Sequence, residues 1–140
     1  LINLFDVKYC ILRFGIIYGR RLDKPSAVEA IVKSLKKNNK IEIGSKKTMR
    51  SFIHIDDIVN SIITSINFKN NCLADIQGSQ KITLEKIVNL TSKILNKKIR
   101  IKEVNKKKPS IRNVLLSKRI DKIDWKPNFT IKQGIRDILK

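Results

Sequence analysis

The stretch VKYCILRFGIIYG, residues 7–19, decides the fold class of this chain. It is a nearly continuous run of β-branched, aromatic and other apolar residues. Such a run predicts a strand that is buried on both faces, as in a parallel sheet. The run ends at Gly15 and Gly19, where glycine permits the chain to turn.

Helical and strand-like segments alternate after this run. Residues 25–38 carry apolar residues at the spacing i, i+3, i+4, i+7 with Ser26 as the N-cap, which predicts an amphipathic helix. Further strands are predicted at residues 40–44, 51–55, 73–78 and 99–104, and further helices begin at Asp56, Thr83 and Thr130. This alternation, without internal repeats, predicts an α/β architecture.

The stretch RSFIHIDDIV, residues 50–59, contains the only histidine of the chain and two adjacent aspartates. For His54, a metal-binding or catalytic role competes with the commoner arrangement, a buried imidazole that is hydrogen-bonded to the backbone. Asp56 stands where a helix N-cap is expected, so a helix start is favoured over a catalytic pair with Asp57. The apolar residues that follow predict the buried stripe of that helix: Ile58, Val59, Ile62, Ile63 and Ile66.

Arg50 directly precedes this buried strand. The planar guanidinium of an arginine in this position can bind an anion, and a diphosphate matches its bidentate donors best. The sequence has no glycine-rich loop of the kind that binds a phosphate at a helix N-terminus. Periodicity alone therefore finds an anion-binding candidate but no complete active site.

The formal net charge of the 140-residue chain is +19. Clustered Lys and Arg residues would favour a nucleic-acid partner. Here the lysines occur in almost every segment, and few aromatic residues stand beside them to stack on bases. We therefore expect nucleic acid to bind only non-specifically.

Neither a membrane span nor a disulfide framework is indicated. No apolar run approaches the about 20 residues of a membrane helix, and the first residues carry charges at Asp6, Lys8 and Arg13. We expect a cytoplasmic protein that makes no membrane contact. Cys10 and Cys72 are far apart and form no C-x-x-C motif, so they are predicted to be buried, reduced thiols.

Three stretches occur in the order and spacing of one protein family: LRFGIIYG at residues 12–19, MRSFIHIDDIV at 49–59 and DWKPNFTIKQGI at 124–135. Together they resemble the C-terminal half of the extended short-chain dehydrogenases, the NAD-dependent sugar-nucleotide epimerases and dehydratases, which include UDP-glucose 4-epimerase. The resemblance covers essentially the whole chain. It implies that residues 1–20 are the last part of an NAD(P)-binding Rossmann domain and that residues 21–140 form the smaller substrate-binding domain.

The resemblance also implies parts that this sequence does not contain. In the family, a glycine-rich turn on an N-terminal Rossmann sheet binds NAD(P), and a Tyr-x-x-x-Lys pair carries out the acid/base chemistry. Neither Tyr9 nor Tyr18 is followed by a lysine four residues later. We therefore expect the chain alone to be redox-inactive, with the cofactor bound mainly by an N-terminal part and a homodimer formed by the full-length protein.

Individual site residues also follow from the resemblance. Phe14 and Gly15 match the strand end beside the nicotinamide, and Ile16 falls where many members have an asparagine that contacts the substrate. Arg50 matches the arginine that binds the nucleotide diphosphate. The strand edge that borders the nucleobase is matched by Ile41, Glu42 and Ile43.

A second phosphate-binding arginine is usual in the family, and Arg112 is its nearest candidate, in competition with Lys106, Lys107 and Lys108. The leading hypothesis is the part of an NAD-dependent epimerase or dehydratase that binds a nucleoside-diphosphate sugar. The sequence does not separate these chemistries from reduction. The alternatives are a basic module that binds nucleic acid or another polyanion, and an inactive gene remnant.

Overall fold

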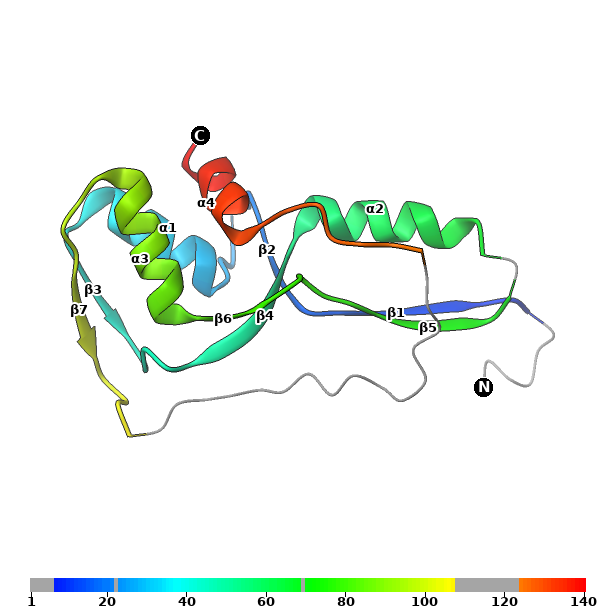
Figure 1. The fold of residues 1–140 in the computed structure, drawn as a ribbon, viewed down its shortest axis with the longest axis horizontal. Helices are drawn as coiled ribbons and strands as arrows, with labels where there is room; N and C mark the ends of the chain where they lie inside the picture. Colours follow the sequence, from blue (N-terminus) through cyan, green and yellow to red (C-terminus); the bar gives the residue numbers. More distant parts are fainter. Residues whose placement is uncertain (1–6, 22, 69, 108–123) are drawn as a thin grey trace.

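A computed structural model of the chain describes residues 7–21, 23–68, 70–107 and 124–140 (Figure 1). The strands are β1 (Cys10–Phe14), β2 (Ile16–Tyr18), β3 (Lys40–Ile43), β4 (Met49–His54), β5 (Cys72–Ile76), β6 (Lys81–Thr83) and β7 (Arg100–Glu103). The helices are α1 (Ala27–Lys37), α2 (Ile55–Ile66), α3 (Leu84–Leu95) and α4 (Ile131–Leu139). Strands and helices alternate, and the predicted α/β class is confirmed.

The described strands form three small sheets. β1 pairs with β5 and β2 pairs with β4, both in parallel, and β6 joins β4 antiparallel. β3 and β7 form a parallel pair in which Lys40 stands opposite Arg100. As the alternating sequence predicted, β7 has one solvated face.

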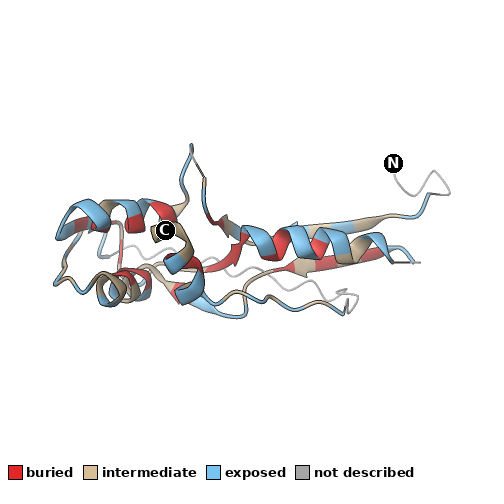
Figure 2. Cartoon of the chain, turned by 90° about the horizontal axis from the view of Figure 1, so that it is seen from above, coloured by how far each residue is buried: buried red, intermediate tan, exposed pale blue. Residues whose placement is uncertain are grey.

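Two hydrophobic clusters hold the elements together. The larger one joins α1, α3 and α4 to β3 and to the strands of the central sheet, and its fully buried members include Val28, Leu35, Ile87, Val88 and Ile135. The smaller one lies between α2 and the strands beneath it and consists of Ile53, Ile58, Ala74 and Ile76, with Trp125 packed against it. Figure 1 shows α1, α3 and α4 at one end and α2 along β1 and β5 at the other. In Figure 2 the buried residues follow these inner faces.

The predicted single strand over residues 7–19 is divided at Gly15 into β1 and β2, which join different sheets. A side chain at Gly15 would lie 3.1 Å from the Ser51 carbonyl oxygen, because the chain passes close to β4 here. The prediction that both faces are buried is wrong for β1, where Ile11 and Phe14 are each 40% exposed. α2 packs on one face of β1 and leaves Ile11 and Arg13 on the exposed face.

Three predicted helix starts are confirmed by their capping hydrogen bonds. Ser26 accepts the Val28 N–H at the start of α1, and Thr83 accepts the Lys86 N–H at the start of α3. At α4, Thr130 forms a reciprocal capping box with Gln133. Local side-chain chemistry therefore fixes where these helices begin.

The predicted cap of α2 is wrong. The N-cap is His54, whose Nδ1 accepts the Asp56 N–H at 3.3 Å, and Asp56 and Asp57 lie in the first turn of the helix. Their negatively charged carboxylates still interact favourably with the positive N-terminal end of the helix dipole.

The predicted buried stripe of α2 is also wrong, except at Ile58. The buried strip of α2 consists of Asp57, Ile58 and Ser61, because the helix contacts the strands along this narrow line. The other apolar residues are between 44% and 75% exposed: Val59, Ile62, Ile63 and Ile66. α2 therefore presents a row of branched apolar side chains to its outer surface.

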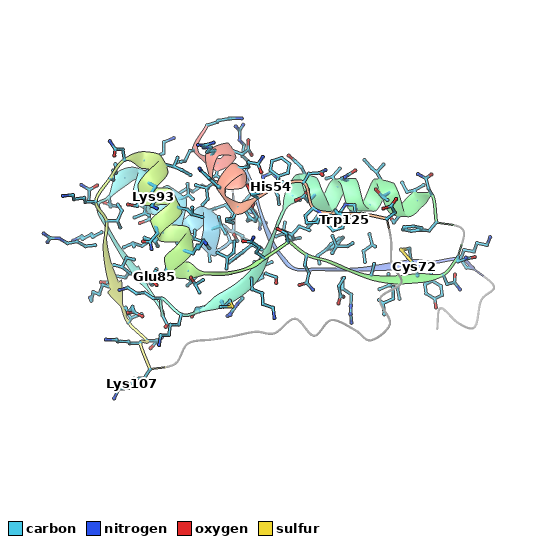
Figure 3. All side chains as sticks on the ribbon, viewed as in Figure 1. His54, Cys72, Glu85, Lys93, Lys107 and Trp125 are labelled. Carbon is cyan, nitrogen blue, oxygen red and sulfur yellow. A yellow bond between two sulfur atoms is a disulfide. The ribbon has the colours of Figure 1, made fainter. Side chains whose placement is uncertain are left out.

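The two cysteines are joined, contrary to the prediction of reduced thiols. Cys10 and Cys72 stand opposite each other in β1 and β5 and form a disulfide (Figure 3). Their distance along the sequence hid this pairing, which depends on the parallel register of the two strands. Among the described residues, no helix has both the length and the apolar character to cross a membrane.

Candidate functional site

β4 carries the candidate anion-binding residue near its beginning. Arg50 is the second residue of the strand and stands opposite Ile82 of β6. Its side chain is partly buried, and Nη1 donates a hydrogen bond to the Met49 carbonyl oxygen at 2.7 Å. A guanidinium carries five N–H donors in a fixed plane, and the oxygen atoms of a diphosphate can accept hydrogen bonds from them.

The three residues matched to the nicotinamide and substrate lie beside the strand of Arg50. Ile16 stands opposite Phe52 in the parallel pair of β2 and β4, and Gly15 approaches Ser51. The side chains of Phe14 and Ile16 are 40% and 37% exposed. An exposed apolar surface at the carboxyl end of a parallel strand fits one face of a nicotinamide ring, since α/β sheets bind cofactors at this edge.

The residues matched to the nucleobase lie on a different sheet. The side chains of Ile41 and Ile43 are 8% and 7% exposed and belong to the larger hydrophobic cluster, so only their backbone is available to a ligand. Glu42 points to the opposite face and accepts a hydrogen bond from Lys102 Nζ at 2.7 Å, which lowers the pKa of its carboxyl group. Within the described residues β3 pairs only with β7, so its second edge faces no other strand.

The candidates for a second phosphate contact are only partly described. Arg112 and Lys108 lie outside the described residues, whereas Lys106 and Lys107 follow β7 and are exposed. The structure thus brings Phe14, Gly15 and Ile16 together with the strand of Arg50 and places β3 on a separate sheet.

Asp57 has a specific partner that the sequence did not reveal. Its carboxylate is 1% exposed and accepts the backbone N–H groups of Asn128 and Phe129, at 2.7 and 3.2 Å. These two hydrogen bonds attach the segment before α4 to the first turn of α2. The adjacent Asp56 is exposed, so the two aspartates differ in role although they are neighbours in the sequence.

His54 completes this attachment (Figure 3). Its imidazole is 1% exposed, stacks on the Phe129 ring with centroids 4.0 Å apart, and meets the Tyr18 ring edge-on at 5.3 Å. Nε2 lies 3.7 Å from Asp137 Oδ2 of α4. The imidazole is therefore a structural contact between β4, β2 and α4, which supports the expected structural role over a catalytic one.

Tyr18 is the largest fully buried side chain of this cluster. Burial raises the pKa of its phenol above the ordinary range, and the negative charges of Asp57 and Glu29 raise it further. Gly134 of α4 leaves the space that the ring occupies, because a methyl group there would overlap the phenol and lie 2.7 Å from Cζ. The phenol is thus kept neutral in a closed packing site.

A buried carboxylate fixes the loop between β2 and α1. Glu29 is fully buried and accepts hydrogen bonds from the Gly19 N–H at 3.2 Å and from the Ser26 hydroxyl, and its Oε1 lies 3.0 Å from Arg21 Nε. Arg21 also donates to the Ile17 carbonyl oxygen at 2.9 Å. This loop leads from Tyr18 of β2 to α1, both of which belong to the larger hydrophobic cluster. The apolar periodicity of α1 did not reveal this role of Glu29, because the residue falls at the border of the apolar stripe.

The fold and these residues define a Rossmann-type α/β protein. Residues 2–75, more than half of the chain, match the model of the NAD dependent epimerase/dehydratase family. The chain belongs to this family. The resemblance to extended short-chain dehydrogenases is thereby confirmed.

Individual relatives agree with this assignment. The "Putative UDP-glucose 4-epimerase" of Methanocaldococcus jannaschii is 24% identical over 98% of this chain and 46% of its own length. "CDP-abequose synthase" of Salmonella typhimurium is 23% identical over 99% of this chain and 50% of its own length. The chain therefore spans about half the length of the curated relatives it matches.

Solved structures show the same fold. UDP-glucuronic acid 4-epimerase from Bacillus cereus, a Y149F variant in complex with a UDP-sugar analogue and NAD, superposes with a TM-score of 0.78 at 20% identity, over 98% of this chain and 47% of that one. UDP-glucose 4-epimerase from Thermotoga maritima gives a TM-score of 0.74 at 17% identity, over 98% and 46% of the two chains.

Proposed function

We propose that this chain is the sugar-nucleotide-binding portion of an NAD(P)-dependent enzyme that acts on a nucleoside-diphosphate sugar. The observation that carries the proposal is the position of Arg50. It stands on β4, two residues before the residue that faces Ile16, so a bound diphosphate would lie close to the exposed Phe14 and Ile16. This proximity is what a reaction between a bound sugar and a nicotinamide requires.

In the proposed complex, the residues of this chain bind and orient the substrate. Arg50 binds the diphosphate through bidentate hydrogen bonds, and Arg112 supplies a second cation. The unpaired edge of β3, at Ile41, Glu42 and Ile43, contacts the nucleobase through backbone groups. Ile16 offers the sugar an apolar contact where an asparagine would offer a hydrogen bond.

NAD(P), when bound, supplies the hydride acceptor and donor. Phe14 and Gly15 would contact its nicotinamide, and an N-terminal part with a glycine-rich turn would hold the rest. The proposed division assigns residues 1–20 to the end of the Rossmann domain and residues 21–140 to the substrate domain. Two elements inside residues 21–140 nevertheless belong with the Rossmann part: β5 pairs with β1, and α2 packs on β1. The exposed apolar row on α2 suits further Rossmann elements.

This chain alone carries no Tyr-x-x-x-Lys motif and no glycine-rich turn, so we expect it to bind nucleotide sugars without catalysing their conversion. We further propose a cytoplasmic protein whose full-length form is a homodimer. Arg50 can be tested without catalysis, because binding is the property in question.

The test is a titration of the chain with UDP-glucose, dTDP-glucose and CDP-glucose, in which binding is measured by calorimetry and by changes in amide chemical shifts. Arg50→Ala should weaken binding about 100-fold or more, since two charge-assisted hydrogen bonds together contribute at least about 3 kcal/mol. Arg50→Lys should fall between, because lysine keeps the charge but loses the bidentate geometry. The matched control is Arg136→Ala, on the exposed side of α4. No binding of any nucleotide sugar, or equal affinity of the Arg50→Ala and Arg136→Ala variants, would contradict the assignment.

A further inference from the structure

The pairing of β3 with β7 brings together two basic segments that are far apart in the sequence. Lys40 stands opposite Arg100 and Glu42 opposite Lys102, and all four side chains are exposed on the same face of the strand pair. Figure 1 shows this pair at the end of the molecule beyond α1 and α3. The strand pair therefore places three cations, Lys40, Arg100 and Lys102, on one exposed face.

A groove runs along this strand pair. One part, of about 500 Å³, extends from the end of α1 across both strands and is lined by Asn38, Lys40, Glu42, Arg100 and Lys102, among others. The adjoining part, of about 590 Å³, shares Asn38, Lys40 and Arg100 and adds Asn39 and Lys98. Cationic groups and amide donors thus line two neighbouring depressions that share Asn38, Lys40 and Arg100.

The charge of the groove is unbalanced. Its lining contains four cations, Lys40, Lys98, Arg100 and Lys102, and one carboxylate, Glu42. Lys102 is paired with Glu42 at 2.7 Å. Within the described part of the chain, no ion pair includes Lys40, Lys98 or Arg100. Besides Lys102, Lys40 also lies close enough to Glu42 to lower the pKa of its carboxyl group, and the four cations and one carboxylate leave the lining with a net charge of +3.

We propose that this groove binds a linear polyanion of phosphate groups through its backbone charge. Side chains two residues apart on one strand are separated by about 6.6 Å, and those on the paired strand by about 4.8 Å, so the cations form a short row rather than a single point. The two lining sets contain no aromatic side chain on which a base could stack. Binding is therefore independent of base sequence. The groove includes Ile41 and Glu42, which the proposed function assigns to the nucleobase contact, but the cations that carry this proposal, Lys40, Lys98 and Arg100, have no role in that function.

The test measures binding of a fluorescent oligothymidine of about 20 nucleotides by anisotropy, from about 50 to about 200 mM salt. The groove variant is Lys40→Glu/Lys98→Glu/Arg100→Glu. The matched control, Lys86→Glu/Lys126→Glu/Lys132→Glu, removes the same charge from exposed lysines of α3, α4 and the segment before α4. The same substitutions to glutamine repeat the comparison without adding negative charge, in case the glutamate variant does not fold.

We expect the groove variants to lower the affinity at least about tenfold and to reduce the slope of log affinity against log salt by about 2, since each phosphate contact on a single strand contributes about 0.7. The control variants should change both quantities much less. Inorganic polyphosphate should displace the oligonucleotide, because only the phosphate chain is recognised. Equal losses in the groove and control variants, absence of binding, or failure of polyphosphate to compete would overturn the proposal.

Discussion

The replacement of Asp57 by alanine tests whether this carboxylate holds the C-terminal segment on α2. Its side chain is 1% exposed and accepts the N–H groups of Asn128 and Phe129. Hydrogen bonds to a charged acceptor contribute about 1.5–3 kcal/mol each, and the lower value applies because these two bonds are only partly buried. We therefore expect Asp57→Ala to reduce the free energy of unfolding by about 3 kcal/mol, about 100-fold in the unfolding equilibrium.

The adjacent residue provides the control. Asp56 occupies the same helical turn, but its side chain is 65% exposed and makes neither of these bonds. Asp56→Ala should cost only the helix-dipole contribution of about 0.3–1 kcal/mol. Asp57→Asn should be intermediate, because the amide keeps one acceptor oxygen and loses the charge.

The assay is urea unfolding followed by circular dichroism, with equal m values required for the comparison. Hydrogen exchange adds a local readout, because the amide protons of Asn128 and Phe129 should lose protection in Asp57→Ala and keep it in Asp56→Ala. If the two alanine variants lose the same stability within about 0.5 kcal/mol, the reasoning is refuted.

Two further predictions concern the packing around Tyr18. Gly134→Ala should destabilise the protein by about 1–2 kcal/mol in urea unfolding, because overlap with the phenol outweighs the about 1 kcal/mol that alanine adds to helix stability. The control is Gly44→Ala, where the added methyl group meets open space and stability should change little. Because the folded pKa of Tyr18 is raised, its unfolded form loses the proton first. The contribution of Tyr18 to the free energy of unfolding should therefore be fully present below the unfolded pKa of about 10 and be lost as the pH rises further. In unfolding experiments at increasing pH, Tyr18→Phe should remove this part of the loss of stability. An unchanged decline in Tyr18→Phe would count against the burial of the phenol.

Local signals in the sequence predicted the helix starts at Ser26, Thr83 and Thr130, because a capping side chain acts within three residues of its partner. The start of α2 was harder, since both His54 and Asp56 offer an acceptor, and the backbone of β4 continues far enough for the histidine to cap. The apolar period of α2 was recognised, but periodicity does not show how wide a face the neighbouring strands cover. Ile62 and Ile66 are exposed for this reason.

Pairings between distant segments could not be predicted from the sequence. The disulfide between Cys10 and Cys72 and the cationic row at Lys40 and Arg100 both depend on parallel register between strands about 60 residues apart. No local pattern encodes such a register. The same applies to Asp57, whose partners Asn128 and Phe129 lie near the opposite end of the chain.

The stretch from Arg50 to Asp57 connects the candidate binding site to the C-terminal segment. Arg50 lies near the start of β4, and His54 at the end of β4 stacks on Phe129. Asp57 binds the backbone of the same segment one turn later. A single strand and helix start therefore carry Arg50, the proposed anion-binding residue, and hold α4 in place. The histidine and the buried aspartate of this motif are thus explained by architecture, whereas the role of Arg50 in ligand binding is the proposal that the Arg50→Ala titration tests.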